Sequence, residues 1–110
     1  MARAYKRLGA TVVTADTDTG LYTVPASTSA VVGNVHVCNI GASSRTFRIA
    51  VVDGAIGTVS NEDYLYYDVS IAANTGVAFN IGLTLPTTYT ILVRASHADV
   101  VFSAFGAEIS

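Results

Sequence analysis

Apolar and polar residues alternate along several short stretches of the chain, which is the pattern of half-buried β-strands. In residues 45–52, Phe47, Ile49 and Val51 fall on one face, while Arg48 falls on the other. No window of eleven residues carries a helical apolar stripe free of Gly or β-branched runs. Val, Ile, Thr, Tyr and Phe together make up 45 of the 110 residues. The chain is therefore predicted to be all-β.

Clusters of turn-forming residues divide the chain at short intervals. They lie at residues 16–20, 25–27, 41–44, 53–54, 60–62, 73–76, 86–88 and 96–99. Eight breaks predict about eight strands, and several connections are longer than a two-residue hairpin. An antiparallel β-sandwich of jelly-roll or Greek-key type fits this spacing better than an up-and-down barrel does.

Some of the predicted strands are apolar on both faces. In residues 100–109, Val101 and Phe105 alternate with Phe102 and Ala104. A sandwich normally exposes the outer face of each sheet to water, and these outer faces are too apolar for that. Only 13% of the residues are charged, against about 25% in an ordinary domain. We therefore expect the protein to bury its outer surface against other protein molecules, as a homo-oligomer or in a larger assembly.

A tyrosine-rich strand is predicted just after residue 63. Strict alternation places Leu65, Tyr67 and Val69 on one face and Tyr64 and Tyr66 on the opposite face. Tyrosine supplies a large, rigid contact area and is enriched at interfaces. Tyr64 and Tyr66 are thus candidate partner contacts, although tyrosines of this kind also cover sheet edges with their hydroxyls in water.

Half of the positive charge lies in the first seven residues. Arg3, Lys6 and Arg7 surround Tyr5, and we interpret residues 1–8 as a basic N-terminal arm that precedes a single domain at residues 9–110. The arm is either a solvated tail or a segment that contacts an acidic neighbour, which makes these four residues candidate contacts. The net charge of −2 disfavours nucleic acid and anionic membranes as partners.

The start of the chain and the single cysteine indicate the cellular compartment in which the protein folds. The start of the chain lacks the uninterrupted apolar run of a secretory signal, and no stretch approaches the length of a membrane-spanning helix. Cys38 has no partner for an internal disulfide and is predicted to be a small buried thiol in its strand. These features predict a protein that folds in a reducing cytoplasm.

Candidate catalytic and metal-ligating residues are few. Ser96, His97 and Asp99 crowd one turn, whereas the members of a catalytic triad converge from different elements. Residues 16–20 hold two aspartates and a Gly but lack the remaining ligands of a calcium loop. His36 and Cys38 share a strand face and would need further ligands to hold zinc. We therefore expect no catalytic residue, no metal and no cofactor.

Among ligand sites, the sequence favours a sugar site most. Carboxylates flank the tyrosine strand as Glu62, Asp63 and Asp68, and such groups beside tyrosines can bind a saccharide or, in facing pairs, hydrolyse one. The plainer interpretation is that Glu62 and Asp63 are loop charges that keep an apolar protein in solution. A hydrolase is the weakest of these hypotheses.

Several segments resemble a family of small all-β structural proteins of tailed bacteriophages. These segments are residues 5–9, 21–32, 37–39, 47–51 and 105–110, so the similarity extends from Tyr5 to Ser110. The match is to a pattern of strands and turns, and it carries over no functional residue.

The resemblance implies a virion component that is made in the host bacterial cytoplasm. Capsid cement or decoration subunits of this kind oligomerise and stabilise the shell, and the resemblance favours a homotrimer bound to the major capsid protein or to other virion proteins. The alternative it leaves open is a neck, tail or fibre component. That alternative includes a carbohydrate-binding module for host attachment, using Tyr64, Tyr66 and Tyr67.

Overall fold

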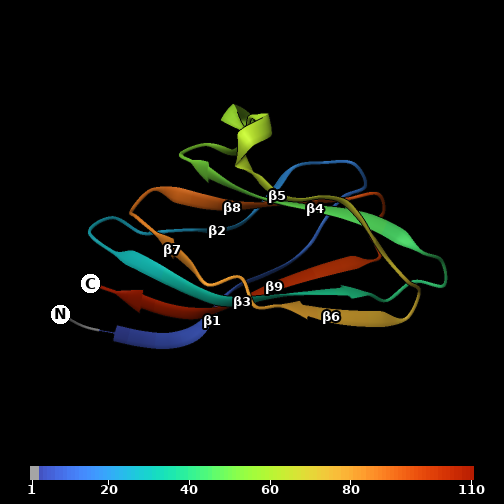
Figure 1. Cartoon of the computed structure of the whole chain (residues 1–110), viewed down its shortest axis with the longest axis horizontal. Helices are drawn as coiled ribbons and strands as arrows, with labels where there is room; N and C mark the ends of the chain where they lie inside the picture. The colour runs from blue at the N-terminus through green and yellow to red at the C-terminus, as the bar shows by residue number, and fades with distance from the viewer. Residues whose placement is uncertain (1–2) are drawn as a thin grey trace.

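The computed structural model describes residues 3–110 as two antiparallel β-sheets packed face to face (Figure 1). Sheet A contains β1 (Arg3–Val12), β3 (Ser29–Asn39), β6 (Thr75–Phe79), β7 (Leu83–Leu85) and β9 (Val100–Ile109). Sheet B contains β2 (Thr19–Thr23), β4 (Arg45–Asp53), β5 (Tyr64–Ile71) and β8 (Tyr89–Ala95). The prediction of an antiparallel β-sandwich is confirmed.

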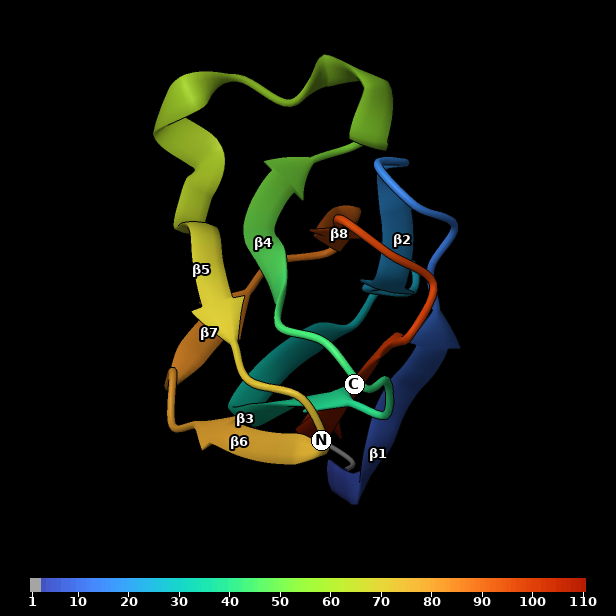
Figure 2. The ribbon, with the colours of Figure 1, turned by 90° about the vertical axis from the view of Figure 1, so that its right-hand side faces the viewer.

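The strand order is that of a jelly roll. Sheet A runs β1-β9-β3-β6, and sheet B runs β2-β8-β4-β5, with every pair antiparallel (Figure 2). Strand β7 pairs with residues 30–32 of β3 and β6 pairs with residues 35–39, so these two short strands occupy one position of the sheet. The nine strands of residues 3–110 therefore fill the eight positions of two interlocked Greek keys.

Alternating side chains from both sheets build the core between them. Phe47 and Ile49 of β4 and Phe102 of β9 are fully buried, and Phe47 contacts Phe102 edge to face, with ring centroids 6.2 Å apart. The predicted alternation of β4 and β9 is confirmed, because Arg48 and Phe105 point outward. None of residues 3–110 belongs to a helix long and apolar enough to span a membrane.

Strand β5 breaks the alternation that the sequence predicts. Tyr67 and Asp68 together oppose Arg48, and Asp68 adopts a left-handed backbone with φ of 50°. This bulge turns Tyr67 outward, and Tyr66 packs into the core against Phe47 and Phe79. The placement of Tyr66 on the outer face beside Tyr64, and of Tyr67 on the inner face beside Val69, is therefore wrong.

The N-terminal residues belong to the sandwich. Strand β1 pairs with β9 from Arg3 opposite Ile109 to Val12 opposite Val101, so residues 3–8 form part of an edge strand and not a separate arm. The cluster of positive charges suggested a separate arm because apolar and polar residues alternate only weakly in this segment. Pairing with the long, apolar β9 nevertheless makes the segment a strand. Met1 and Ala2 lie outside the described residues.

Two further differences concern single residues. Cys38 is exposed, contrary to the prediction of a buried thiol, because Val35, Val37 and Asn39 take the inward positions of β3. Gly106 marks a close approach of β9 to β3, since a Cβ there would collide with the carbonyl oxygen of Val31. That approach lies beside a bulge at Gly33, where the pairing of the two strands shifts by one residue.

Candidate interaction surface

The outer face of sheet A is a broad surface of mostly uncharged side chains, which we call the apolar face. The registers of β1, β9 and β3 bring its members into adjacent rows. They are Tyr5, Arg7, Ala10 and Val12 on β1, Val101, Ser103, Phe105, Ala107 and Ile109 on β9, and Val31, Asn34, His36 and Cys38 on β3. Arg7 is the only charged residue among these thirteen.

Large apolar side chains on this face are open to solvent. Tyr5 is 76% exposed, Val12 61%, and Val31 and Phe105 38% each. Phe105 packs its ring edge to face against His36, with centroids 5.3 Å apart. Several exposed apolar side chains gathered on one face of a sheet are a mark of an interaction site.

A shallow hollow lies at one end of the apolar face, across β1, β9 and β3. Ala107 forms its floor, and Tyr5, Val31 and Ile109 stand around it, enclosing a volume of about 180 Å³. Tyr5, Ala107 and Val31 occupy one row across the three strands. The small Ala107 between larger neighbours creates the depression, and the exposed Phe105 lies two residues away on the same strand.

The outer face of sheet B is arranged differently, because the chain covers half of it. Two short 3-10 turns, η1 (Ile56–Thr58) and η2 (Asn61–Asp63), stand above β4 and β5 in Figure 1. Ile56, Val59 and Tyr64 pack there onto Leu92, Ala50 and Val52, which are buried although they point away from the core. We call residues 55–63 the lid segment.

The uncovered half of that face carries paired charges. Arg48 binds Asp68 through two hydrogen bonds, Nε to Oδ1 at 2.7 Å and an Nη atom to Oδ2 at 3.3 Å. The guanidinium also lies 4.0 Å from the ring centroid of Tyr67. The hydrogen bond from Arg48 holds the pKa of Asp68 below its ordinary value. The bulge in β5 makes this arrangement possible, because it sets Tyr67 and Asp68 together opposite Arg48.

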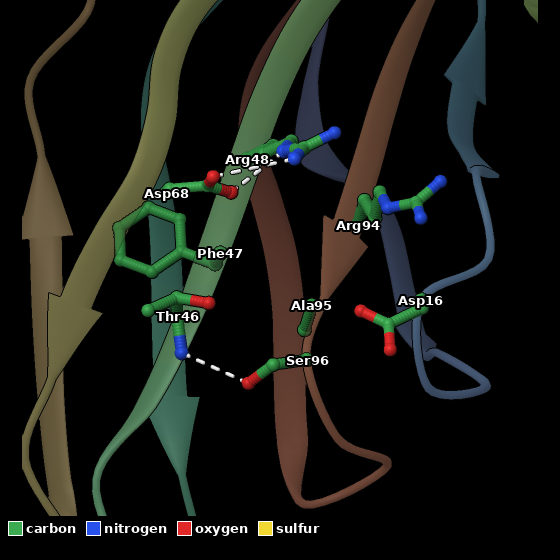
Figure 3. A pocket seen from close by; sticks show the side chains of 8 residues that line it. All are labelled: Asp16, Thr46, Phe47, Arg48, Asp68, Arg94, Ala95 and Ser96. Atoms are coloured by element: carbon green, nitrogen blue, oxygen red, sulfur yellow. Dashed lines mark hydrogen bonds and ion pairs between the residues drawn. The ribbon is translucent and has the colours of Figure 1, made fainter.

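A second arginine extends this row of charges across the sheet. Arg94 of β8 is directly opposite Arg48 in the register, and its guanidinium lies 3.3 Å from Asp18 in the loop before β2. The two arginines line a small cleft of about 20 Å³, with Asp16 and Asp68 beside them (Figure 3). Two like charges are tolerated side by side because each has a carboxylate partner on its far side.

A third polar cluster joins the two sheets at one edge. Tyr22 of β2 donates a hydrogen bond of 2.5 Å to Glu108 of β9, and the Lys6 ammonium lies 2.7 Å from the other oxygen of that carboxylate. These two hydrogen bonds, that of Lys6 foremost, hold the pKa of Glu108 below its ordinary value. Burial, together with the hydrogen bond to Glu108, raises the pKa of Tyr22.

The candidate contact residues are distributed over several surfaces. Tyr5 and Arg7 lie on the apolar face, whereas Lys6 is engaged at the sheet edge by Glu108. Tyr64 packs under the lid segment and forms an edge-to-face pair with Tyr67, with centroids 5.0 Å apart. Arg3 begins β1, and its side chain lies outside what the structure describes.

The residues considered for catalysis and metal binding are engaged in other contacts. Ser96 Oγ accepts a hydrogen bond from the Thr46 backbone, seen as a dashed line in Figure 3. His97 Nδ1 lies 3.1 Å from the Asp99 carboxylate, which Arg45 also contacts at 3.3 Å. Within residues 3–110, no three His, Cys, Asp or Glu side chains gather as metal ligands would.

The residues considered for a sugar site are only partly brought together, because Tyr64, Tyr67 and Asp68 gather around Arg48 whereas Tyr66 is turned into the core. Glu62 and Asp63 lie in η2, where the Asp63 carboxylate accepts hydrogen bonds from the backbone and hydroxyl of Ser60. Asp68 is bound to Arg48, and Tyr66 is part of the core. Tyr67 is 56% exposed, but the Arg48 guanidinium lies over its ring.

Sequence reasoning did not single out Val31, Phe105 and Ala107 as contact residues. The alternation of residues 100–109 showed that β9 is apolar on both faces. The hollow, however, depends on which residues stand opposite one another in β1, β9 and β3. Comparison of the chain with protein-family models, with curated proteins and with solved structures finds no match in any of the three.

Proposed function

We propose that this chain is a non-enzymatic structural subunit of a tailed-bacteriophage particle, a capsid cement or decoration protein that docks through the apolar face. The observation that carries the proposal is the apolar face itself. Sheet B receives a cover from the lid segment, whereas Tyr5, Val12, Val31 and Phe105 of sheet A are left exposed.

The size of the apolar face fits a protein partner. Strands of ten and eleven residues at about 3.3 Å per residue are about 33 Å long, and the three strands β1, β9 and β3 at about 4.8 Å span about 14 Å. The product, about 480 Å² of flat area, is close to the roughly 500 Å² per partner that a biological interface needs at the least.

The virion setting rests on the resemblance of the segments between Tyr5 and Ser110 to small phage structural proteins. The jelly roll agrees with it, since capsid proteins use this fold, but lectins and cupins use it too. The carboxylates and tyrosines considered for sugar binding are engaged in other contacts, since Arg48 binds Asp68, Ser60 binds Asp63 and Tyr66 packs against the core. This favours the structural role over the carbohydrate-binding one. A subunit of this kind stabilises a shell by burying apolar surface and needs no reactive group.

Co-sedimentation with empty capsids of the phage that encodes the chain tests the proposal. We expect the wild-type protein to pellet with capsids and Val31→Lys to lose at least about tenfold in affinity, because burying an unpaired ammonium in an interface is costly. Leu65→Lys is the matched control. Leu65 is an exposed leucine of β5 in sheet B, outside the apolar face.

Two results would contradict the proposal. One is a wild-type protein that stays in the supernatant at every concentration. The other is equal loss of binding in Val31→Lys and Leu65→Lys, which would show that docking does not use the apolar face.

A further inference from the structure

We infer that the apolar face pairs with the apolar face of a second copy of this chain around a two-fold axis, with Phe105 of each copy seated in the hollow of the other. The inference rests on the proposed use of this face for assembly. The second copy occupies the face in the free protein, and this reversible pair must open before the same face docks on a shell. The features that lead to it are the ring of Phe105, which is 38% exposed, and the neighbouring depression above Ala107.

An isologous interface needs a surface that is complementary to itself, so a projection must find a hollow on the same face. Phe105 and Ala107 provide both, two residues apart on β9 and pointing to the same side. A two-fold axis that lies in the interface and crosses β9 at right angles beside Gly106 exchanges these two levels. It therefore places each Phe105 ring over the Ala107 of the other copy.

The hollow has room for the ring. Its volume of about 180 Å³ is lined by Tyr5, Val31, Ala107 and Ile109, all of them apolar or aromatic. Large side chains that face small ones across an interface give the interdigitated packing of a protein interior. Phe105 is already ordered by its edge contact with His36, so seating the ring costs little further freedom.

The same axis accommodates the charge of Arg7. Arg7 stands in the row of Phe105, and Tyr5 stands in the row of Ala107, both on β1. The exchange of rows lays Arg7 of one copy over the Tyr5 ring of the other, where a cation–π contact is favourable. The two arginines do not meet each other, so the pairing avoids like-charge repulsion.

The area of overlap sets the strength of the pair. The rows from Ser103 to Ile109 of β1, β9 and β3 face one another, about 23 Å along the strands and about 14 Å across them, which is about 330 Å² of flat area on each copy. This is smaller than a standard specific interface, as in weak and transient complexes. We therefore expect a reversible, concentration-dependent dimer. The rows around Val101 extend beyond the overlap.

A variant exchange, measured by sedimentation velocity over a micromolar concentration series, tests the pairing. Phe105→Ala removes the projection and Ala107→Leu fills the hollow, so each variant alone should dimerise at least about tenfold more weakly than wild type. A mixture of the two keeps one wild-type contact and sets the introduced leucine opposite the introduced alanine in the other, so it should form heterodimers. Leu65→Ala in sheet B should dimerise as wild type does.

The native Cys38 gives a second measurement without disturbing the pairing residues. It is exposed and paired with Val101, five residues along β9 from Gly106. At about 3.3 Å per residue and about 10 Å between packed sheets, two Cys38 positions related by this axis lie about 35 Å apart. Pulsed electron paramagnetic resonance on protein spin-labelled at Cys38 should report that distance.

The outcomes separate this inference from the proposed function. A monomer or a trimer overturns the two-fold pairing, and so does a mixture of variants that associates no better than either variant alone. If such a protein still pellets with capsids and loses that binding in Val31→Lys, the proposed function stands without the pairing. A dimer that ignores capsids supports the pairing and contradicts the proposed function.

Discussion

The outer faces of the two sheets start from similar sequence patterns and end in different environments. Leu92 of β8 and Phe105 of β9 are both apolar residues that point away from the core. Leu92 is fully buried under the lid segment, whereas Phe105 is 38% exposed. An apolar side chain that points away from the core can thus be shielded from water by a segment of the same chain or by another molecule.

The two faces differ in charge as well as in cover. Where the lid segment ends, sheet B carries Arg48 and Arg94, each paired with an aspartate. The apolar face has Arg7 as the only charged member of its thirteen described residues. Solvated ion pairs keep a surface free of partners, so we regard the charged half of sheet B as the side that remains in water.

The largest expected effect is the difference in the free energy of unfolding between a substitution on the inner side of β9 and one on its outer side. Phe102→Ala removes a fully buried ring of β9 and should lower the free energy of unfolding by about 3–5 kcal/mol. Phe105→Ala, three residues away, should change it far less and should weaken association instead. Denaturant unfolding of both variants measures the difference. Equal losses of stability would contradict the assignment of Phe105 to an interaction surface.

The second effect tests whether the lid segment gives sheet B a true second core. Leu92→Ala should cost about 2–5 kcal/mol in the free energy of unfolding, as for any buried leucine, although the side chain points outward. Val31→Ala on the apolar face is the control and should cost much less, since Val31 is 38% exposed. If the thermal unfolding midpoints of the two variants coincide, the lid segment is not a stabilising cover.

The smallest effect concerns the cluster that joins the sheets at their edge. The pKa of Glu108 is lowered in the folded state, so its contribution to stability is present above the unfolded value of about 4.3 and is lost as the pH falls through the lower folded value. Glu108→Gln should therefore flatten the acid side of the stability profile, and Tyr22→Phe should flatten it in part. A slope in Glu108→Gln equal to that of wild type would contradict this role.

The strands and turns of this chain were largely predictable from its residues. All eight predicted breaks overlap connections between strands, because Gly, Pro, Asn, Asp and Ser act locally and need no partner strand. The break at residues 80–82, which divides β6 from β7, was not predicted. Both flanking segments pair with β3, so the interruption depends on that long neighbour.

The outward residues were less predictable, because they depend on pairing between strands. The orientation of Tyr66 and Tyr67 follows from the bulge opposite Arg48, and the exposure of Cys38 follows from the burial of its neighbours in β3. The cover over Leu92 comes from the lid segment, which has no strand alternation. Strands that are apolar on both faces therefore indicated that some outward side chains must be shielded from water by something other than the two sheets. The pattern could not show that the lid segment of the same chain shields those of sheet B.

The pairing of the first and last strands has a practical consequence for work with this protein. Arg3 stands opposite Ile109, so both ends of the described chain emerge at one corner, as Figure 1 shows. Ile109 also borders the hollow above Ala107. An affinity tag or fluorescent fusion at either end would thus hang over the apolar face. The lid segment, on the far side of the sandwich, is the better place to carry a reporter.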